Sequence, residues 1–170
     1  MDIVRLLKVI LISAVVILST SCNNSALDYN LAIYHGKNKN YKKAITYFDK
    51  VLLSDPSNFK ALHNRAIMNQ MLRREEQAIA DYTQALELDD KHVISYVNRG
   101  VSKMRMGMYE EAILDYQKAI NINSNEGLAF KNIGNVHKLK GENTKACENW
   151  RKAQKLGSDC SYYLRINNCK

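Results

Sequence analysis

The feature that most constrains the fold is a period of about 34 residues that runs through most of the chain. An alanine recurs four times at this spacing, at Ala44, Ala78, Ala112 and Ala146. An aromatic residue follows each alanine after four residues, at Phe48, Tyr82, Tyr116 and Trp150. A small apolar residue comes three residues later, at Val51, Ala85, Ala119 and Ala153. Three matching columns at one spacing indicate a structural unit that is repeated and stacked.

Within each unit the apolar residues recur at helical spacing. In the third unit, Tyr109, Ala112, Ile113 and Tyr116 fall on one face of a helix. The chain has 170 residues but only one Pro and 7 Gly, which favours long helices with short turns over a many-stranded β fold. A single helical hairpin does not bury its own apolar face, so neighbouring units must stack.

The period and these residues resemble the tetratricopeptide repeat, a pair of antiparallel helices. That family has a small residue near the middle of the first helix, where this chain has Ala32, Ala66, Gly100 and Gly134. The resemblance covers about residues 25–160. It implies an all-α fold, a right-handed superhelix of about four repeats. We expect the repeats at 25–58, 59–92, 93–126 and 127–160, followed by a capping helix at 161–170.

Two pairs of charged residues support this register. Arg65 and Arg99 are one period apart in the first helices of the two central repeats, and Asp81 and Asp115 are one period apart in the second helices. The two outer repeats have neither the Arg nor the Asp. Because both residues of the pair occur together or are absent together, we expect a structural salt bridge in each central repeat and not a catalytic pair.

The start of the chain, up to Cys22, has the layout of an export signal. Two basic residues precede a mainly apolar stretch at 9–18, which is followed by small or polar residues and then by Cys22. Small residues before a cysteine resemble the lipobox of bacterial lipoproteins. The resemblance implies removal of a signal peptide at 1–21, acylation of Cys22, a tether at 22–26 and lipid anchoring to a membrane of the cell envelope, periplasmic or outer. Ordinary secretion, with Cys22 as a free thiol, and an uncleaved membrane anchor stay open as alternatives.

Four asparagines also follow the period, one in the first helix of each repeat: Asn30, Asn64, Asn98 and Asn132. In the tetratricopeptide repeat family this position faces a concave groove, and some peptide-binding members use it to bind the main chain of an extended segment. An asparagine suits this role because it offers one acceptor and two donors. The resemblance places Lys60, His63, Lys131 and Asn135 in the same groove. Alternatively, the asparagines cap or bridge neighbouring helices and were inherited by repeat duplication.

The resemblance also narrows the class of partner. Members of the family that clamp the acidic tail of a chaperone need Lys and Asn in the first repeat, where this chain has Tyr29 and Ile33. Binding of chaperone C-termini is therefore not expected. The formal net charge is +8, but the basic residues are spread along the chain and mixed with acids. This mixture favours solvated helix surfaces over a nucleic-acid site.

Three cysteines lie in or after the fourth repeat. Cys147 is nine residues before the expected end of a helix near Leu156, and Cys169 is nine residues after the expected start of the cap near Cys160. Antiparallel helices would place these two cysteines level, so we predict a Cys147–Cys169 disulfide. Cys160 and Cys169 would be about 13 Å apart along one helix, too far to bridge. Three reduced thiols are the alternative.

Patterns typical of enzymes and metal sites are absent from the sequence, including CxxC, HExxH, GxSxG and P-loop spacings. His35 and His137 occupy equivalent packing positions, while His63 and His92 stand alone. We expect no catalytic site, metal or cofactor. The sequence predicts an adaptor that binds a segment of another protein. The alternative is a scaffold subunit that oligomerises through its outer surface or an edge, and the oligomeric state stays open.

Overall fold

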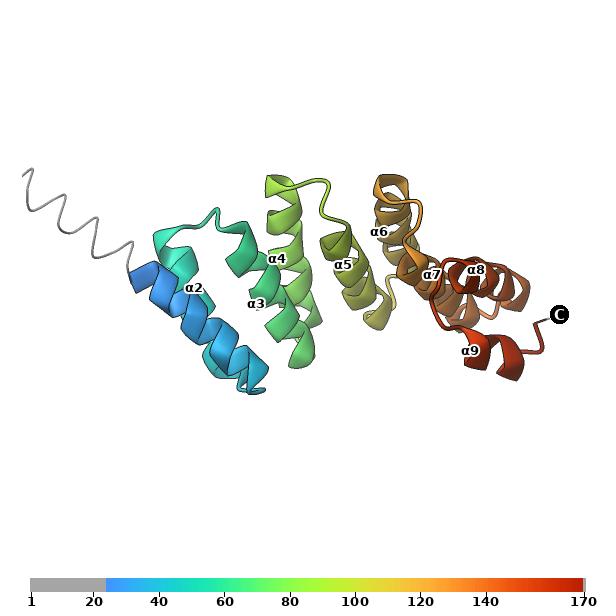
Figure 1. Cartoon of the computed structure of the whole chain (residues 1–170), viewed down its shortest axis with the longest axis horizontal. Helices are drawn as coiled ribbons and strands as arrows, with labels where there is room; N and C mark the ends of the chain where they lie inside the picture. The colour runs from blue at the N-terminus through green and yellow to red at the C-terminus, as the bar shows by residue number, and fades with distance from the viewer. Residues whose placement is uncertain (1–23, 170) are drawn as a thin grey trace, which may run out of the picture.

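The computed structural model describes residues 24–169, and all regular elements within them are α-helices (Figure 1). The N-terminal helix covers residues 24–37. It is followed by α2 (Tyr41–Ser54), α3 (Phe59–Met71), α4 (Glu75–Leu88), α5 (Val93–Arg105), α6 (Tyr109–Ile122), α7 (Gly127–Leu139), α8 (Asn143–Lys155) and α9 (Ser161–Ile166). None of these helices is both long and apolar enough to span a membrane.

The helices form hairpins that stack in chain order. The pairs α3 and α4, α5 and α6, and α7 and α8 pack most extensively, and α4 with α5 and α6 with α7 join one hairpin to the next. The repeats therefore follow one another along the long axis of the molecule (Figure 1). The predicted all-α stack of helical hairpins is confirmed.

The first helices of the repeats lie on the inner side of the stack. Helix α5 contacts both α3 and α7, the first helices of the neighbouring repeats, whereas no two of the second helices α2, α4, α6 and α8 pack on each other to this extent. First helices that approach each other more closely than second helices give the stack its curvature. We call the surface formed by the N-terminal helix, α3, α5 and α7 the inner face.

The repeated columns form the core. Phe48, Tyr82, Tyr116 and Trp150 are all fully buried, as are the four alanines that precede them. The small residues of the first helices make room for these rings. A Cβ added to Gly100 would lie 2.6 Å from Cε1 of Tyr116, and one added to Gly134 would lie 2.5 Å from Cδ1 of Trp150. Glycine at these two positions is thus required by the close approach of a large ring.

Each hairpin turns through one residue in the left-handed region of backbone space. These residues again follow the repeat period, with φ of 60° at Lys39, 59° at Arg73, 78° at Gly107 and 79° at Gly141. A side chain makes this conformation less favourable by about 1–2 kcal/mol. The turn therefore has the same geometry in every repeat although only the last two have glycine there.

Both predicted salt bridges are present in the central repeats. Nε and Nη2 of Arg65 donate to the two carboxylate oxygens of Asp81 at 3.0 and 2.6 Å. Nε and Nη2 of Arg99 donate to those of Asp115 at 2.9 and 2.7 Å. The aspartates are buried, and the parallel geometry of each pair is the arrangement in which Arg binds carboxylate best. The prediction of a structural pair in each central repeat is confirmed.

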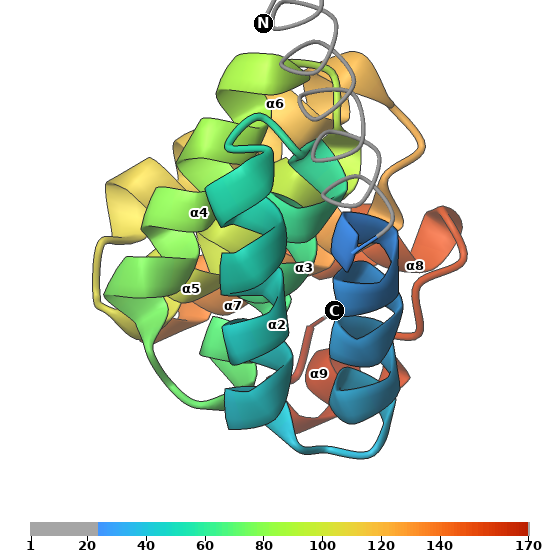
Figure 2. The same cartoon turned by 90° about the vertical axis from the view of Figure 1, so that its left-hand side faces the viewer.

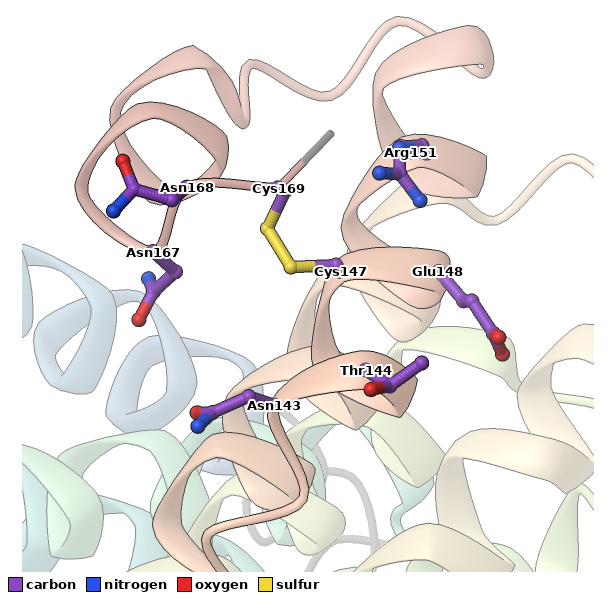
Figure 3. A pocket seen from close by; sticks show the side chains of 8 residues that line it. All are labelled: Asn143, Thr144, Cys147, Glu148, Arg151, Asn167, Asn168 and Cys169. Carbon is purple, nitrogen blue, oxygen red and sulfur yellow. A yellow bond between two sulfur atoms is a disulfide. The ribbon is translucent and has the colours of Figure 1, made fainter.

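The C-terminal segment closes the stack on α8. A disulfide joins Cys147 in α8 to Cys169, with Cα atoms 5.4 Å apart (Figure 3), and Cys160 is a buried free thiol. The pairing agrees with the prediction, but the cap is shorter than the predicted helix at 161–170. Helix α9 ends at Ile166, and Asn168 turns the chain with a φ of 49°, which brings Cys169 back to α8.

The start of the described chain also differs from the expectation. Residues 24–26 belong to the N-terminal helix, although the sequence suggested a tether at 22–26. Helical structure here is consistent with the absence of Pro and Gly from residues 23–34. The predicted signal peptide at 1–21 and the acylation site at Cys22 lie outside the described residues.

Candidate protein-binding face

The inner face carries one stripe of side chains on each first helix. In an α-helix, the residues at positions i−4, i+3 and i+7 lie on the same side as residue i. Around Asn64 these residues are Lys60, Ile67 and Met71, and around Asn98 they are Ile94, Val101 and Arg105. The asparagine column therefore lies in the middle of the inner face, with longer side chains on either side of it.

Access to the four asparagines decreases along the stack. Asn30 is exposed, Asn64 and Asn98 are half-buried, and Asn132 retains only 7% of its exposed surface. A partner can therefore reach the column in the first three repeats. The prediction that Asn132 contacts a partner is corrected, because its side chain is buried.

The side-chain NH₂ group of Asn64 already donates two hydrogen bonds within the protein. Its Nδ2 donates to the hydroxyl of Tyr29 at 3.0 Å and to the backbone oxygen of Lys60 at 2.8 Å. Both hydrogens of the carboxamide are thus used, and within residues 24–169 its Oδ1 accepts no hydrogen bond. The bridge to Tyr29 supports the alternative that asparagine links neighbouring repeats.

Gln70 fixes the helix that carries Asn98. Its Nε2 donates to the backbone oxygen of Asn98 at 2.8 Å and to Oγ of Ser102 at 2.7 Å, while its Oε1 accepts from the hydroxyl of Tyr82 at 2.8 Å. One side chain therefore connects α3, α4 and α5. Gln70 was not singled out in the sequence, because nothing in the repeated columns marks a contact between neighbouring repeats.

His63 is a packing residue and not a free group of the binding face. Its Nδ1 lies 2.7 Å from Oγ of Ser95, and its ring lies 4.9 Å from that of His92. Burial and, to a smaller extent, the nearby charge of His92 lower the pKa of His63 to about 4. The imidazole is therefore neutral at pH 7 and joins the second repeat to the third. His63 and His92, which have no counterparts in the other repeats, are in contact with each other.

Two further predicted residues, Lys131 and Asn135, are engaged by the fourth repeat and its cap. Nζ of Lys131 lies 3.3 Å from the backbone oxygen of Asp159 and 5.4 Å from the centre of the Tyr163 ring. Oδ1 of Asn135 accepts a hydrogen bond of 3.1 Å from Nε1 of Trp150. Lys131 and Asn135 therefore make contacts within the fourth repeat and its cap, and the accessible asparagines of the column lie on the first three repeats.

Exposed aliphatic side chains flank the asparagines. Met71 and Ile94 are exposed and lie on either side of the amide column, on α3 and α5. The periodic spacing that reveals the asparagines could also have revealed these positions, since Ile94 and Leu128 are one period apart and both are exposed. The face thus combines amides that can bind a main chain with apolar groups that can contact side chains.

The charge of the inner face is modest. Lys60 is exposed, but Arg105 is paired with Glu75 through a contact of 3.1 Å between Nη1 and Oε1. No group of three or more His, Cys, Asp or Glu side chains within residues 24–169 is arranged to hold a metal ion. The inner face thus offers groups for hydrogen bonds and for apolar contact.

Family profiles described as tetratricopeptide repeat match residues 29–58, 59–92 and 93–126. These segments cover more than half of the chain and end where the predicted repeats end. The chain belongs to the tetratricopeptide repeat family. It is thus a domain for protein–protein interaction, built from repeats that typically act as non-catalytic scaffolds. The fourth hairpin, α7 and α8, continues the same packing beyond the matched residues.

Several solved structures share the fold. The crystal structure of MamA has 23% sequence identity and a TM-score of 0.76, with 86% of each chain covered. The TPR domain of Arabidopsis OM64 has 24% identity and a TM-score of 0.66, and the match covers 69% of this chain and 98% of that one. The first TPR of Spaghetti (RPAP3), bound to the HSP90 peptide SRMEEVD, has 22% identity and a TM-score of 0.66, covering 70% and 94%. No curated protein sequence matches the chain significantly.

Proposed function

We propose that the chain is a non-catalytic adaptor that binds an extended segment of a partner protein along the inner face of its first three repeats. The observation that carries the proposal is the row formed by Asn30, Asn64 and Asn98, of which none is fully buried. A row of carboxamides at repeat spacing can bond successive peptide groups without selecting their side chains. Met71 and Ile94 would then provide apolar contact for side chains of the segment.

The similarity to a repeat domain that holds a bound peptide supports this kind of ligand. The partner chemistry must differ from that of a chaperone tail, because Tyr29 occupies a clamp position and its hydroxyl accepts the hydrogen bond from Asn64. A neutral or mildly acidic segment with spaced aliphatic residues fits the exposed groups of the face best.

We further propose that the chain works at the cell envelope, anchored through Cys22. The order of basic, apolar and small residues before Cys22 supports export, and a Cys147–Cys169 disulfide suits an oxidising compartment. The adaptor would hold its partner close to a membrane.

Replacing Asn64 and Asn98 together with Ala should weaken binding of a partner peptide by about five- to 150-fold. Each substitution removes a hydrogen bond to the peptide main chain, worth about 0.5–1.5 kcal/mol. The probe is a peptide selected on the full chain from a random display library, and its affinity is measured by isothermal calorimetry. Methylation of single peptide nitrogens should have a similarly large effect at the bound positions.

The matched control replaces two asparagines on second helices, Asn121 and Asn149, with Ala. Both variants should keep the helical circular dichroism of the native chain, and the control should keep its affinity within about twofold. Equal affinity of the native chain and the Asn64→Ala/Asn98→Ala variant would refute recognition through the amide column.

A further inference from the structure

The first repeat exposes apolar residues at positions that are buried or half-buried in all later repeats. Leu27 and Tyr34 retain 57% and 62% of their exposed surface. The positions equivalent to Leu27 hold small, fully buried residues: Ala61, Ser95 and Ala129. Those equivalent to Tyr34 hold a half-buried Met68 and the buried Ser102 and Val136.

The difference has a simple cause in the stack. In later repeats the preceding hairpin covers these positions and restricts the size of the side chain. Within residues 24–169 no hairpin precedes the first repeat, and the N-terminal helix and α2 form the end of the molecule (Figure 2). Large apolar side chains at an uncovered end indicate that something other than another repeat covers them.

A group of exposed lysines borders this end. Lys37, Lys39, Lys42 and Lys43 are all exposed, and the last three line a hollow of about 320 Å³ between the turn of the first repeat and Leu72 at the end of α3. Asp28 is the one acid between residues 24 and 48, and Nζ of Lys50 lies 4.0 Å from it. The lysines therefore leave an uncompensated positive charge at the end of the helix that carries Tyr34, about ten residues along the helix from Leu27.

The covalent chain connects this end to the proposed anchor. Cys22 is only two residues before Asn24, where the described N-terminal helix begins, so there is no long tether between them. A helix over residues 24–37 is about 20 Å long at 1.5 Å per residue. The lysine group lies at the C-terminal end of this helix. A membrane surface that runs along the helix would therefore contact the anchor at one end, then Leu27 and Tyr34, and then the lysines at the other end.

We propose that the end of the first repeat, formed by Leu27, Tyr34 and the four lysines, rests on the surface of an anionic lipid bilayer. This inference depends on the proposed envelope location. Leucine and tyrosine insert at the boundary of headgroups and acyl chains, and lysines pair with anionic headgroups. Contact along the whole helix would fix the orientation of the inner face relative to the membrane.

A second copy of the chain is a less suitable occupant. A two-fold dimer through this end would bring each group of four lysines toward its own copy, and like charges placed against each other oppose association. Anionic lipid has the complementary charge.

The test uses the full chain with Tyr34→Trp, bound to vesicles of phosphatidylethanolamine and phosphatidylglycerol that contain brominated lipid. The native Trp150 is fully buried, so residue 34 provides the responsive emission. We expect emission at position 34 to be quenched at least threefold more than in a Leu114→Trp variant, whose reporter lies on α6 at a site that is 66% exposed. The triple change Lys39→Glu, Lys42→Glu and Lys43→Glu should reduce quenching to the level found in pure phosphatidylcholine vesicles.

Co-sedimentation separates the two proposals. Co-sedimentation with equal quenching at positions 34 and 114 would overturn the docking of this end while leaving the membrane location intact. Failure to co-sediment with anionic vesicles would overturn both, but not peptide binding by the inner face, which is measured without lipid. A blue shift at position 34 that depends on protein concentration without vesicles would show that a second copy covers this end, and would also overturn the proposal.

Discussion

Replacing Asp115 with Ala should lower the free energy of unfolding by about 3–5 kcal/mol, because it leaves two mostly buried cations without their acid. Asp115 accepts a hydrogen bond from Nη2 of Arg99 at 2.7 Å and forms an ion pair with Nζ of Lys103 at 2.9 Å, and those side chains retain 15% and 13% of their exposed surface. Urea unfolding followed by circular dichroism measures the change.

The matched control is Asp49→Ala in the first repeat. Asp49 also accepts from an arginine, at 2.6 Å from Nη1 of Arg65, but its side chain is 53% exposed. Arg65 keeps its buried partner Asp81 in that variant, so we expect a loss below about 1 kcal/mol, as for exposed pairs. Similar losses for the two variants would contradict the view that burial makes the Asp115 pair essential.

Reduction of the Cys147–Cys169 disulfide should lower the free energy of unfolding by about 3 kcal/mol. The bond closes a loop between cysteines 22 positions apart, and a loop of this length is expected to contribute about that amount by restricting the unfolded chain. Thermal unfolding with and without a phosphine reductant measures the effect. The melting temperature should fall as the cap loses its covalent attachment to α8.

A Cys147→Ser variant provides the control for the reductant. It should show the lower stability from the start and should not respond further to reduction, because Cys160 remains a buried free thiol. A melting temperature of the native chain that does not change on reduction would contradict a stabilising role for the bond.

The repeated columns made most of the fold predictable from sequence. A residue that recurs at one spacing occupies the same place in each hairpin, so the burial of Tyr82 and Tyr116 follows from the stacking alone. The joint occurrence of Arg65 with Asp81 predicted their contact for the same reason. The disulfide could be predicted because two antiparallel segments place Cys147 and Cys169 level.

Contacts that break the period were not predictable. His63 and His92 are not one period apart, and their contact arises where the loop before α5 passes the side of α3. The contact of Lys131 with Asp159 depends on the path of the chain after α8. The burial of Asn132 was not predictable either. The column of asparagines predicts where Asn132 lies on its helix, but its burial depends on neighbouring segments that do not follow the period.

Site-specific photocrosslinking tests the central claim most directly. A benzoylphenylalanine at Met71 or Ile94, both exposed on the inner face, is compared with one at Leu53 or Leu114, both exposed on second helices. The bound probe is the selected peptide used for the asparagine variants. We predict crosslinks from the two inner positions and none from the outer ones. Crosslinks from Leu53 or Leu114 alone would show that the partner binds the outer surface, and would contradict recognition by the inner face.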